Sequence, residues 1–320
     1  MKHYIGIDLG GTNIKAALVD ENGSILHQCT RPTHAEAGPD AVAEVMAAMV
    51  DELSGGERVQ GVGIGCPGTV DNGAGTVVFA CNLGWVRYPL RDALKARTGY
   101  APFLVNDANA AALAEATVGA AKGAQSAVIV TLGTGIGGGV VLGGKLLTGF
   151  TGAASEPGHT VVVADGQPCT CGRRGCWETY ASATALIRMT RGAMARHPES
   201  ALHEIAEKCG GVDGRTAFFG REAGDEAADG VVQEYIHYLA LGIANLVNIF
   251  FPEVVALSGG IANQGEALLV PLRKEVARQE YAGAYTKIHP KLLQCSLGND
   301  AGVIGAALFA RQSTEMKETE

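Results

Sequence analysis

Residues 4–26, YIGIDLGGTNIKAALVDENGSIL, carry the pattern from which the architecture can be worked out. An apolar run at 4–7 leads into a glycine turn at 8–13, and then Ile14, Ala16 and Leu18 alternate with more polar positions. Alternation with a period of two is typical of a strand buried on one face, and Asn22-Gly23 is a common hairpin turn. The segment therefore predicts a β-meander of strand, glycine turn, strand, hairpin and strand.

The same order begins again at residue 128, where VIVTLGTGIGGGVVLGG runs to residue 144. An apolar run precedes a turn built of glycine and threonine, a second apolar run follows, and Gly143-Gly144 marks a hairpin. We therefore expect an internal duplication of one fold, in which each copy presents its glycine turn to a shared cleft.

Helices and strands alternate between and after these two segments. The expected elements are a helix from residue 40, strands at 59–64 and 102–105, an alanine-rich helix at 108–118, mostly helix at 177–251, a strand at 254–257 and a last helix at 301–311. The last helix is rich in small residues, which predicts close packing against a neighbour. The charged tail at 312–320 is uncapped, and we expect it to fray.

Composition narrows the class of protein. A chain of 320 residues that is 47% hydrophobic can form two domains. A net charge of −8 without a basic run argues against nucleic acid or an anionic membrane as the main partner. Residues 235–252 carry no formal charge but include His237, Asn245 and Asn248, so we expect a buried core helix there and no membrane span. No apolar signal segment precedes the first strand, which favours the cytoplasm.

A cluster of metal-ligating side chains follows the second glycine turn. His159, Cys169, Cys171 and Cys176 have the spacing H-x₉-C-x-C-x₄-C in a glycine-rich turn. Three thiolates and one imidazole form the Cys₃His set that structural Zn²⁺ prefers, and a site with four protein ligands is closed and activates no water. The alternative is a disulfide or free buried thiols, which eight cysteines in a chain without a signal segment do not favour.

Two familiar phosphate-binding motifs do not fit the glycine turns. Residues 8–12 lack the Gly-Lys-Ser/Thr of a P-loop. Gly133, Gly135 and Gly138 match G-x-G-x-x-G, but a strand follows where a dinucleotide site needs a helix. Backbone N–H groups in both turns could still bind phosphate oxygens, helped by the hydroxyls of Thr12 and Thr134. Two ordinary hairpins are the alternative.

Four segments together resemble a known family: DLGGT at 8–12, LGTGIGGG at 132–139, EPGH at 156–159 and CTCGRRGCWE at 169–178. They are similar in order and spacing to the ROK family of bacterial sugar kinases, and within it to the glucokinases. The resemblance implies an α/β protein with the actin-like ATPase (ribonuclease H-like) fold and a cleft between two α/β domains. The domains are expected at 1–118, completed by the helix at 300–311, and at 119–299, with the zinc loop at 159–176.

The resemblance also implies a reaction. ATP and Mg²⁺ would bind in the cleft, and the γ-phosphate would pass to the 6-hydroxyl of a hexose, most closely glucose. Asp107 stands at the end of a predicted strand, where the family places its catalytic base. The alternative is that it only caps the helix at 108, although the two roles are compatible. Carboxylates and amides suit sugars because each can hold two hydroxyls. The expected sugar-binding residues are Gly68, Asn82, Asn106, Asp107, Glu156, His159 and Glu178.

The remaining site residues are expected on the nucleotide side. They are Asp8, Gly10, Gly11, Thr12, Asn13, Lys15, Gly133, Thr134, Gly135, Gly137, Gly259 and Gly260. Asp8 is expected to help organise Mg²⁺, and Gly259 and Gly260 resemble the family's turn on the adenosine side. His159 is expected to use one ring nitrogen for zinc and the other for a sugar hydroxyl. Pro157 departs from the aliphatic residue more common in the family and weakens the assignment of the sugar.

Other functions stay open. An N-acetylmannosamine or N-acetylglucosamine kinase is the main alternative, followed by a fructose or allose kinase. A sugar-responsive repressor would carry a helix-turn-helix of many tens of residues before the first strand, where this sequence has only residues 1–3. A silent sugar-binding protein would be expected to lose Asp107 or a phosphate turn, and both are present. We also expect a homo-oligomer, either a dimer or a tetramer.

Overall fold

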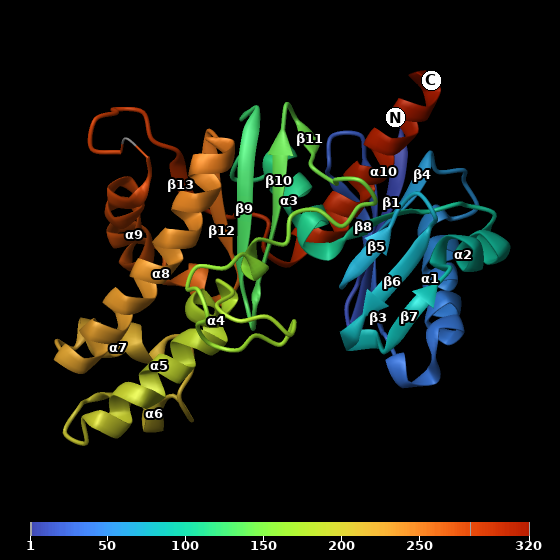
Figure 1. Ribbon diagram of the computed structural model, residues 1–320. Helices are drawn as coiled ribbons and strands as arrows, with labels where there is room; N and C mark the ends of the chain where they lie inside the picture. The colour runs from blue at the N-terminus through green and yellow to red at the C-terminus, as the bar shows by residue number, and fades with distance from the viewer. Residues whose placement is uncertain (1, 282, 320) are drawn as a thin grey trace. The chain divides into compact units, whose positions relative to one another are not determined.

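A computed structural model describes residues 2–281 and 283–319 of the chain (Figure 1). The chain forms two compact units. The first contains Met1–Gln125, Gly139–Ser155 and Ser296–Glu320, and the second contains Ser126–Gly138 and Glu156–Cys295, apart from the three residues outside the description. The domain boundaries expected from the sequence stay a prediction. The compact units place residues 119–125, 139–155 and 296–299 with the first unit, whereas the expected second domain spans 119–299.

A five-stranded sheet of order β3-β2-β1-β4-β8 forms the centre of the first unit. Its strands are β1 (His3–Leu9), β2 (Asn13–Asp20), β3 (Ile25–Pro32), β4 (Gly61–Cys66) and β8 (Phe103–Asn106). β1, β2 and β3 form the predicted antiparallel meander, while β1, β4 and β8 run parallel to one another. Asp8 of β1 pairs with Lys15 of β2 and lies beside Gly65 of β4.

Alternation along β1 sends its side chains into two different cores. Ile5 and Ile7 pack with α1 (Pro39–Ser54) and α2 (Leu90–Thr98) on one face of the sheet. Tyr4 packs on the other face with α3 (Asp107–Thr117) and α10 (Ala301–Thr319). The period of two seen in the sequence therefore corresponds to a sheet covered by helices on both sides.

The predicted close packing of the last helix is confirmed. A Cβ atom on Gly6 of β1 would lie 1.9 Å from the carbonyl oxygen of Val303, and one on Gly63 of β4 would lie 1.9 Å from that of Ala306. Only glycine lets α10 approach these strands so closely. Figure 1 shows α10 running beside α3 and β1, which it contacts.

The expectation that residues 312–320 fray is wrong for the described part of the tail, while Glu320 lies outside the described residues. α10 continues to Thr319. Gln312 donates from Nε2 to the carbonyl oxygen of Gly144 at 3.2 Å, and Arg311 bonds to the carbonyl oxygen of Glu21. These contacts tie the helix to the first unit beyond residue 311, which a reading of charge alone could not reveal.

A small antiparallel sheet of order β5-β6-β7 was not predicted. Its strands are β5 (Thr69–Asp71), β6 (Thr76–Ala80) and β7 (Trp85–Tyr88). Strands this short carry too few alternations to be recognised from the sequence. The sheet follows β4 directly and carries the 3₁₀ turn Cys81–Leu83 between β6 and β7.

The second sheet repeats the topology of the first, with the order β11-β10-β9-β12-β13. Its strands are β9 (Ser126–Leu132), β10 (Ile136–Leu142), β11 (Lys145–Leu146), β12 (Val254–Ser258) and β13 (Lys291–Gln294). When the five strands of each sheet are counted in chain order, the first strand lies between the second and the fourth. The fourth and fifth strands run parallel to the first. The predicted internal duplication is therefore confirmed.

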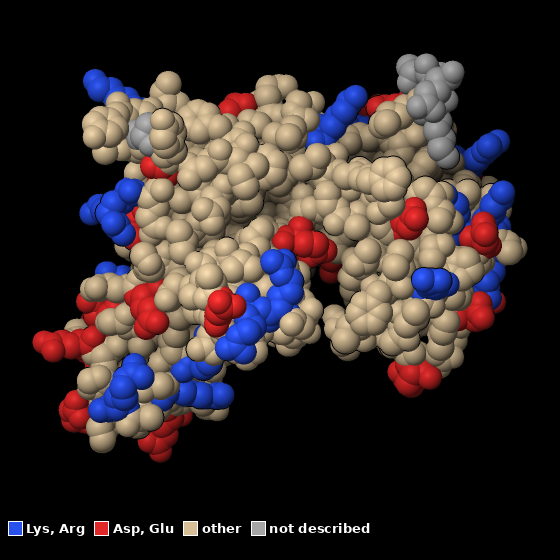
Figure 2. All heavy atoms as spheres, in the orientation of Figure 1, with Lys and Arg blue, Asp and Glu red and all other residues tan. Residues whose placement is uncertain are grey.

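Helices make up most of the second unit, as expected for 177–251. They are α4 (Glu178–Ala181), α5 (Ala183–Arg196), α6 (Leu202–Lys208), α7 (Thr216–Glu222), α8 (Glu226–Phe250) and α9 (Glu266–Gln279). In residues 2–281 and 283–319, no helix is long and apolar enough to cross a membrane, and the uncharged stretch at 235–252 falls largely in α8. Figure 2 shows side chains of both charges mixed over α5, α6 and α7.

Candidate active site

The carboxyl ends of parallel strands in the first unit gather several of the predicted site residues. Asp8 lies near the end of β1, Gly68 follows β4, and Asn106 ends β8. Cys66 pairs with Asn106 across β4 and β8, so the residues that follow these two strands start from the same edge. In α/β folds this edge is where ligands bind.

Asp107 is the first residue of α3, next to the capping residue Asn106. The Asn106 carbonyl oxygen Oδ1 accepts from the backbone N–H of Asn109 at 3.1 Å, and its Nδ2 donates to the carbonyl oxygen of Gly68 at 3.0 Å. Because Asn106 caps the helix, Asp107 is free of that task. Its Oδ1 accepts from the N–H of Ala108 at 2.9 Å. Burial raises the pKa of the Asp107 carboxyl above its usual range, while hydrogen bonds with the Asn106 side chain and its own backbone N–H lower it.

Asp8 is a second carboxylate on this edge. Burial, together with the negative charge of Asp107, raises the pKa of Asp8 to about 6, while Lys15 lowers it. Its Oδ2 lies against the start of α10, since a Cβ atom on Gly302 would be 2.5 Å away. A pair of neighbouring carboxyl groups whose pKa values are both raised is typical of a site for a cation or a transferable proton.

Lys15 is held by a partner that the sequence did not reveal. Its ammonium group bonds to the carboxylate of Asp300 and to the carbonyl oxygen of Asn299 at 3.4 Å. Asp300 follows Lys15 by 285 residues, so no local pattern could have identified the pair. The contact places the entry to α10 beside the first glycine turn.

The glycine turn of the first unit lies beside the 3₁₀ turn that carries Asn82. A Cβ atom on Gly11 would lie 3.4 Å from the Cβ atom of Asn82. The turn is closed by a bond from the N–H of Gly10 to the carbonyl oxygen of Asn13 at 3.0 Å. Gly11, Thr12, Asn13 and Asn82 are exposed and therefore accessible to a ligand.

The glycine turn of the second unit is fixed by the start of α5. The carbonyl oxygen of Gly133 accepts from the N–H of Ala183 at 2.9 Å, and that of Thr134 accepts from Oγ1 of Thr184 at 2.7 Å. The N–H of Gly133 donates within the turn to the carbonyl oxygen of Gly135 at 3.1 Å, so the later N–H groups of the turn are the candidates for binding a ligand. Thr134 is exposed, and Gly137 lies in β10 directly after the turn.

A second turn adjoins it at the end of β12. Ser258 pairs with Thr131 of β9, and their hydroxyl oxygens lie 2.9 Å apart. Gly259 has φ of 88°, and a Cβ atom on it would lie 2.3 Å from the carbonyl oxygen of Leu132. Gly259 and the exposed Gly260 thus share a sheet edge with the 133–135 turn; their place in a nucleotide site stays a prediction.

The Cys₃His cluster has the dimensions of one tetrahedral metal site. Two sulfur ligands at about 2.3 Å from Zn²⁺ lie about 3.8 Å apart. The sulfur atoms of Cys171 and Cys176 are 3.7 Å apart, and that of Cys169 is 3.7 Å from Nδ1 of His159. The four ligand atoms lie within 4.8 Å of one another, and all eight cysteines are free thiols.

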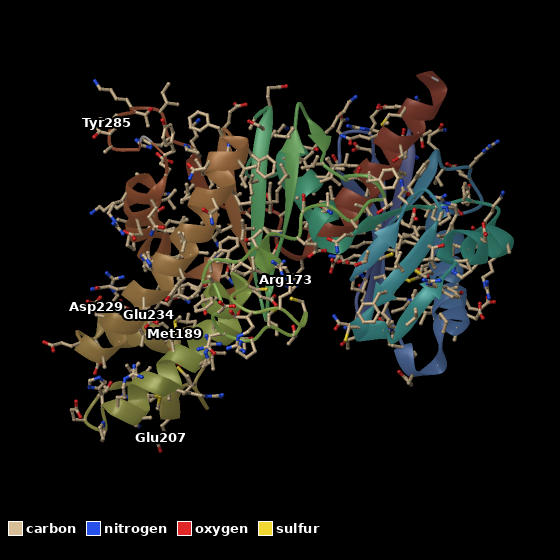
Figure 3. All side chains as sticks on the ribbon, viewed as in Figure 1. Arg173, Met189, Glu207, Asp229, Glu234 and Tyr285 are labelled. Atoms are coloured by element: carbon tan, nitrogen blue, oxygen red, sulfur yellow. The ribbon has the colours of Figure 1, made fainter. Side chains whose placement is uncertain are left out.

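Glu178 joins this cluster to the glycine turn of the same unit. Its Oε1 accepts from the thiol of Cys169 at 3.0 Å, and its Oε2 accepts from the N–H of Ile136 at 3.4 Å. Glu178 begins α4 immediately after the metal loop. Arg173, labelled in Figure 3, braces the loop by donating from Nη1 to the carbonyl oxygen of His159 at 3.2 Å.

The sequence matches the ROK family over residues 4–313. The chain belongs to the ROK family. A glucokinase of Thermotoga maritima is 41% identical to it over 312 residues, which is 96% of this chain and 97% of that protein. A ROK family glucokinase from Streptomyces griseus, solved in complex with glucose and AMPPNP, is 38% identical with a TM-score of 0.79, covering 97% of this chain and 99% of that one.

A further ROK relative has a different name. An N-acetylmannosamine kinase of Citrobacter koseri is 34% identical over 310 residues, covering 96% of this chain and 98% of that protein. The match to solved ROK kinases confirms the actin-like ATPase fold that the resemblance implied.

The predicted site residues of this ROK chain fall into two groups, one in each unit. In the second unit, Glu156 is exposed and precedes the 3₁₀ turn Pro157–His159, so it lies three residues from a metal ligand. Nδ1 of His159 faces Cys169, which leaves Nε2 as the nitrogen that could contact a ligand. Which of these residues touch sugar or nucleotide stays a prediction.

Proposed function

We propose that this protein is an ATP-dependent hexose kinase that transfers the γ-phosphate of ATP to the 6-hydroxyl of glucose. The observation that carries the proposal is the position of Asp107, a half-buried carboxyl with a raised pKa at the start of α3. It stands where the ROK resemblance expects a base, in a chain 41% identical to a protein named glucokinase.

In the proposed reaction the Asp107 carboxylate accepts the proton of the 6-hydroxyl. The hydroxyl oxygen then forms a bond to the γ-phosphorus as the bond between that phosphorus and the leaving oxygen of ADP breaks. Phosphoryl transfer depends mainly on positioning and on neutralising charge. A carboxyl with a raised pKa is well matched to taking up a proton near neutral pH.

The two glycine turns are assigned to the phosphates of ATP, and Gly259 and Gly260 to its adenosine side. Asp8 would hold Mg²⁺, which supplies charge neutralisation of the phosphates. The donor chemistry fits, because Mg²⁺ prefers carboxylate oxygen and water, and ionised Asp8 lies half-buried near Asp107. Lys15 is kept as a phosphate ligand, although it would have to share its ammonium group with Asp300.

The sugar ligands are proposed in both groups: Gly68, Asn82, Asn106 and Asp107 from the first unit, and Glu156, His159 and Glu178 from the second. One sugar held by both groups must draw the two units onto it. Closure of this kind excludes water that would otherwise hydrolyse ATP. ATP turnover without sugar is therefore expected to be slow.

The Cys₃His cluster is proposed to bind one structural Zn²⁺. Its sulfur spacing supports this assignment over a catalytic metal, because four protein ligands leave no open position. The metal would fix the loop that carries His159 and leads into Glu178.

A coupled assay of ADP release across glucose, mannose, fructose, N-acetylglucosamine and N-acetylmannosamine tests the proposal. We expect the highest kcat/KM for glucose. The 34% identity to an N-acetylmannosamine kinase favours one alternative, and a higher kcat/KM for N-acetylmannosamine would establish it. ADP release with none of the five sugars would refute a hexose kinase.

We also propose a homo-oligomer, a dimer or a tetramer. Large apolar side chains are exposed on the second unit near the end of α8 and in the loop after α9: Ile249, Phe251, Tyr281, Tyr285 and Ile288. Figure 3 shows Tyr285 pointing away from the fold. Exposed apolar patches mark interaction sites. Light scattering should show a larger mass than the 32.9 kDa chain, and Tyr285→Glu should lower it.

A further inference from the structure

Glu115 is a buried carboxylate that binds two distant segments of the chain. It lies near the end of α3 and is 1% exposed. Its Oε2 accepts from the backbone N–H of Ala120 at 2.8 Å. Its Oε1 accepts from the N–H of Ser296 at 2.9 Å and from that of Leu297 at 2.8 Å. Oγ of Ser296 adds a longer contact to Oε2 at 3.4 Å.

Backbone N–H groups, and no cation, satisfy this carboxylate. Among the described residues, no lysine, arginine or histidine forms an ion pair with Glu115. The turn after α3 folds tightly round it, since a Cβ atom on Gly119 would lie 2.1 Å from Oε2. A buried carboxylate held by several N–H groups is rigid in position, because losing any one bond leaves a buried donor unpaired.

The chain passes between the two units four times, after residues 125, 138, 155 and 295. The two segments held by Glu115 carry the first and the last of these crossings: Ala120 stands six residues before Ser126 of the second unit, and Ser296 is the first residue after the last return. One side chain on α3 therefore fixes both the first departing segment and the last returning segment. The same helix begins with Asp107, eight residues or about 12 Å away along the axis.

We propose that Glu115 is the hinge anchor of this protein and a positioning residue for phosphoryl transfer; this rests on the proposed kinase function and its closure on sugar. Domain movements are absorbed by a few residues at the ends of elements. With Ala120, Ser296 and Leu297 fixed to α3, movement at the first and last crossings is confined to the short lengths of chain beyond these residues. Asp107, on the same helix, then keeps one position relative to these two segments each time the protein closes and opens.

The test uses E115Q in the full-length, zinc-loaded protein. Glutamine keeps the shape of the side chain and one acceptor oxygen. Its NH₂ group replaces the other oxygen and faces an N–H donor, with which it cannot form a hydrogen bond. The matched control is D20N: Asp20 is 8% exposed and its Oδ1 accepts from the N–H groups of Asn22 and Ser24 at 2.9 and 2.8 Å. It ends β2 in the same unit, and its side chain bonds only within the β2–β3 turn, which approaches Val118 through Gly23 but does not hold Ala120, Ser296 or Leu297.

We expect E115Q to speed hydrogen exchange at 118–126 and 294–298 by at least about tenfold in the sugar-free protein. We expect kcat to fall by about tenfold while the KM for glucose changes less than about threefold, because chemistry is misaligned and sugar contacts are intact. D20N should leave kcat within about twofold. E115D, which restores the charge, should recover part of the loss in kcat.

Wild-type kcat and wild-type exchange at both segments in folded E115Q would overturn the proposal. If E115Q does not fold, G119A displaces the same carboxylate from the opposite side and must give the same exchange pattern for the proposal to stand. The exchange experiment needs no sugar or ATP. A wild-type protein inactive on all sugars would therefore refute the kinase function while leaving the exchange result to decide on the anchor.

Discussion

Oε1 of Glu178 lies 3.0 Å from the sulfur atom of Cys169, so a metal ligand and a predicted sugar ligand are in direct contact. The position of the carboxylate consequently depends on the loop that the thiols close. Any change that opens the loop should weaken sugar binding more than it weakens nucleotide binding.

Metal removal tests this dependence. Purified protein should contain about one zinc per chain, as one four-ligand site requires. Cys171→Ser should raise the KM for glucose far more than the KM for ATP, whereas Cys209→Ser, a thiol outside the cluster in the same unit, should change neither. Elemental analysis and steady-state kinetics give both answers, and full activity in a zinc-free preparation would contradict the assignment.

Asp107→Asn separates catalysis from structure. Asn106 caps α3, and an amide oxygen at 107 can still accept from Ala108, so the fold and glucose affinity should be retained. The amide cannot take up a proton, and kcat should fall by roughly 10²- to 10⁴-fold. Calorimetric glucose binding and single-turnover rates measure the two effects. If kcat falls by less than about tenfold, a residue other than Asp107 is the base.

Asp8 should make the affinity for Mg²⁺ depend on pH. Its pKa is raised from 3.8 to about 6, so the stability it contributes relative to the unfolded chain is complete below 3.8 and is lost as pH rises through 6. Metal binding has the opposite sign, because only the ionised carboxylate is a ligand. The apparent affinity for Mg²⁺ should therefore weaken by up to about tenfold per unit as pH falls below 6.

Lys15→Met provides the matched variant for this titration. Lys15 lowers the pKa of Asp8, so its removal should shift the loss of Mg²⁺ affinity to higher pH. Activity titrated with Mg²⁺ between pH 5 and 8, the range around the raised pKa, measures the shift. Identical profiles for the two proteins would show that Asp8 does not control metal binding.

Gly259→Ala should disturb the turn on the proposed adenosine side. The new Cβ would stand 2.3 Å from the carbonyl oxygen of Leu132 at a φ of 88°. Strain of this kind costs about 1–3 kcal/mol, which should lower Tm and raise the KM for ATP. Gly260→Ala is the control for stability, since its Cβ would meet nothing within 4 Å. Equal Tm values for the two variants would contradict the geometry.

Local patterns made the duplicated sheets and the metal cluster predictable. The alternation after residue 13 and the glycine turns repeat at 128–144, and both copies form the same sheet order. The four metal ligands lie within 18 residues of sequence, from His159 to Cys176, so their spacing alone brings them together. Signals of this kind need only neighbours in the sequence.

Contacts between distant residues were not predictable. Glu115 stands in an alanine-rich helix, where a charged residue usually faces solvent, yet its partners at 296 and 297 bury it. The ion pair of Lys15 with Asp300 and the attachment of α10 to residues 21 and 144 have the same origin. Each arises because the chain returns to the first unit after residue 295.

Because of that return, the two units are completed in a fixed order during protein synthesis. A ribosome delivers the whole of the second unit before α10, the helix that covers Tyr4, Val105 and Leu113 and lies against Asp8. During translation the second unit and its metal loop can fold while the first sheet is still open on one side. A nascent chain shorter than about 300 residues can therefore load its metal but cannot assemble the Asp8 edge, so a truncated product should be inactive and prone to chaperone capture.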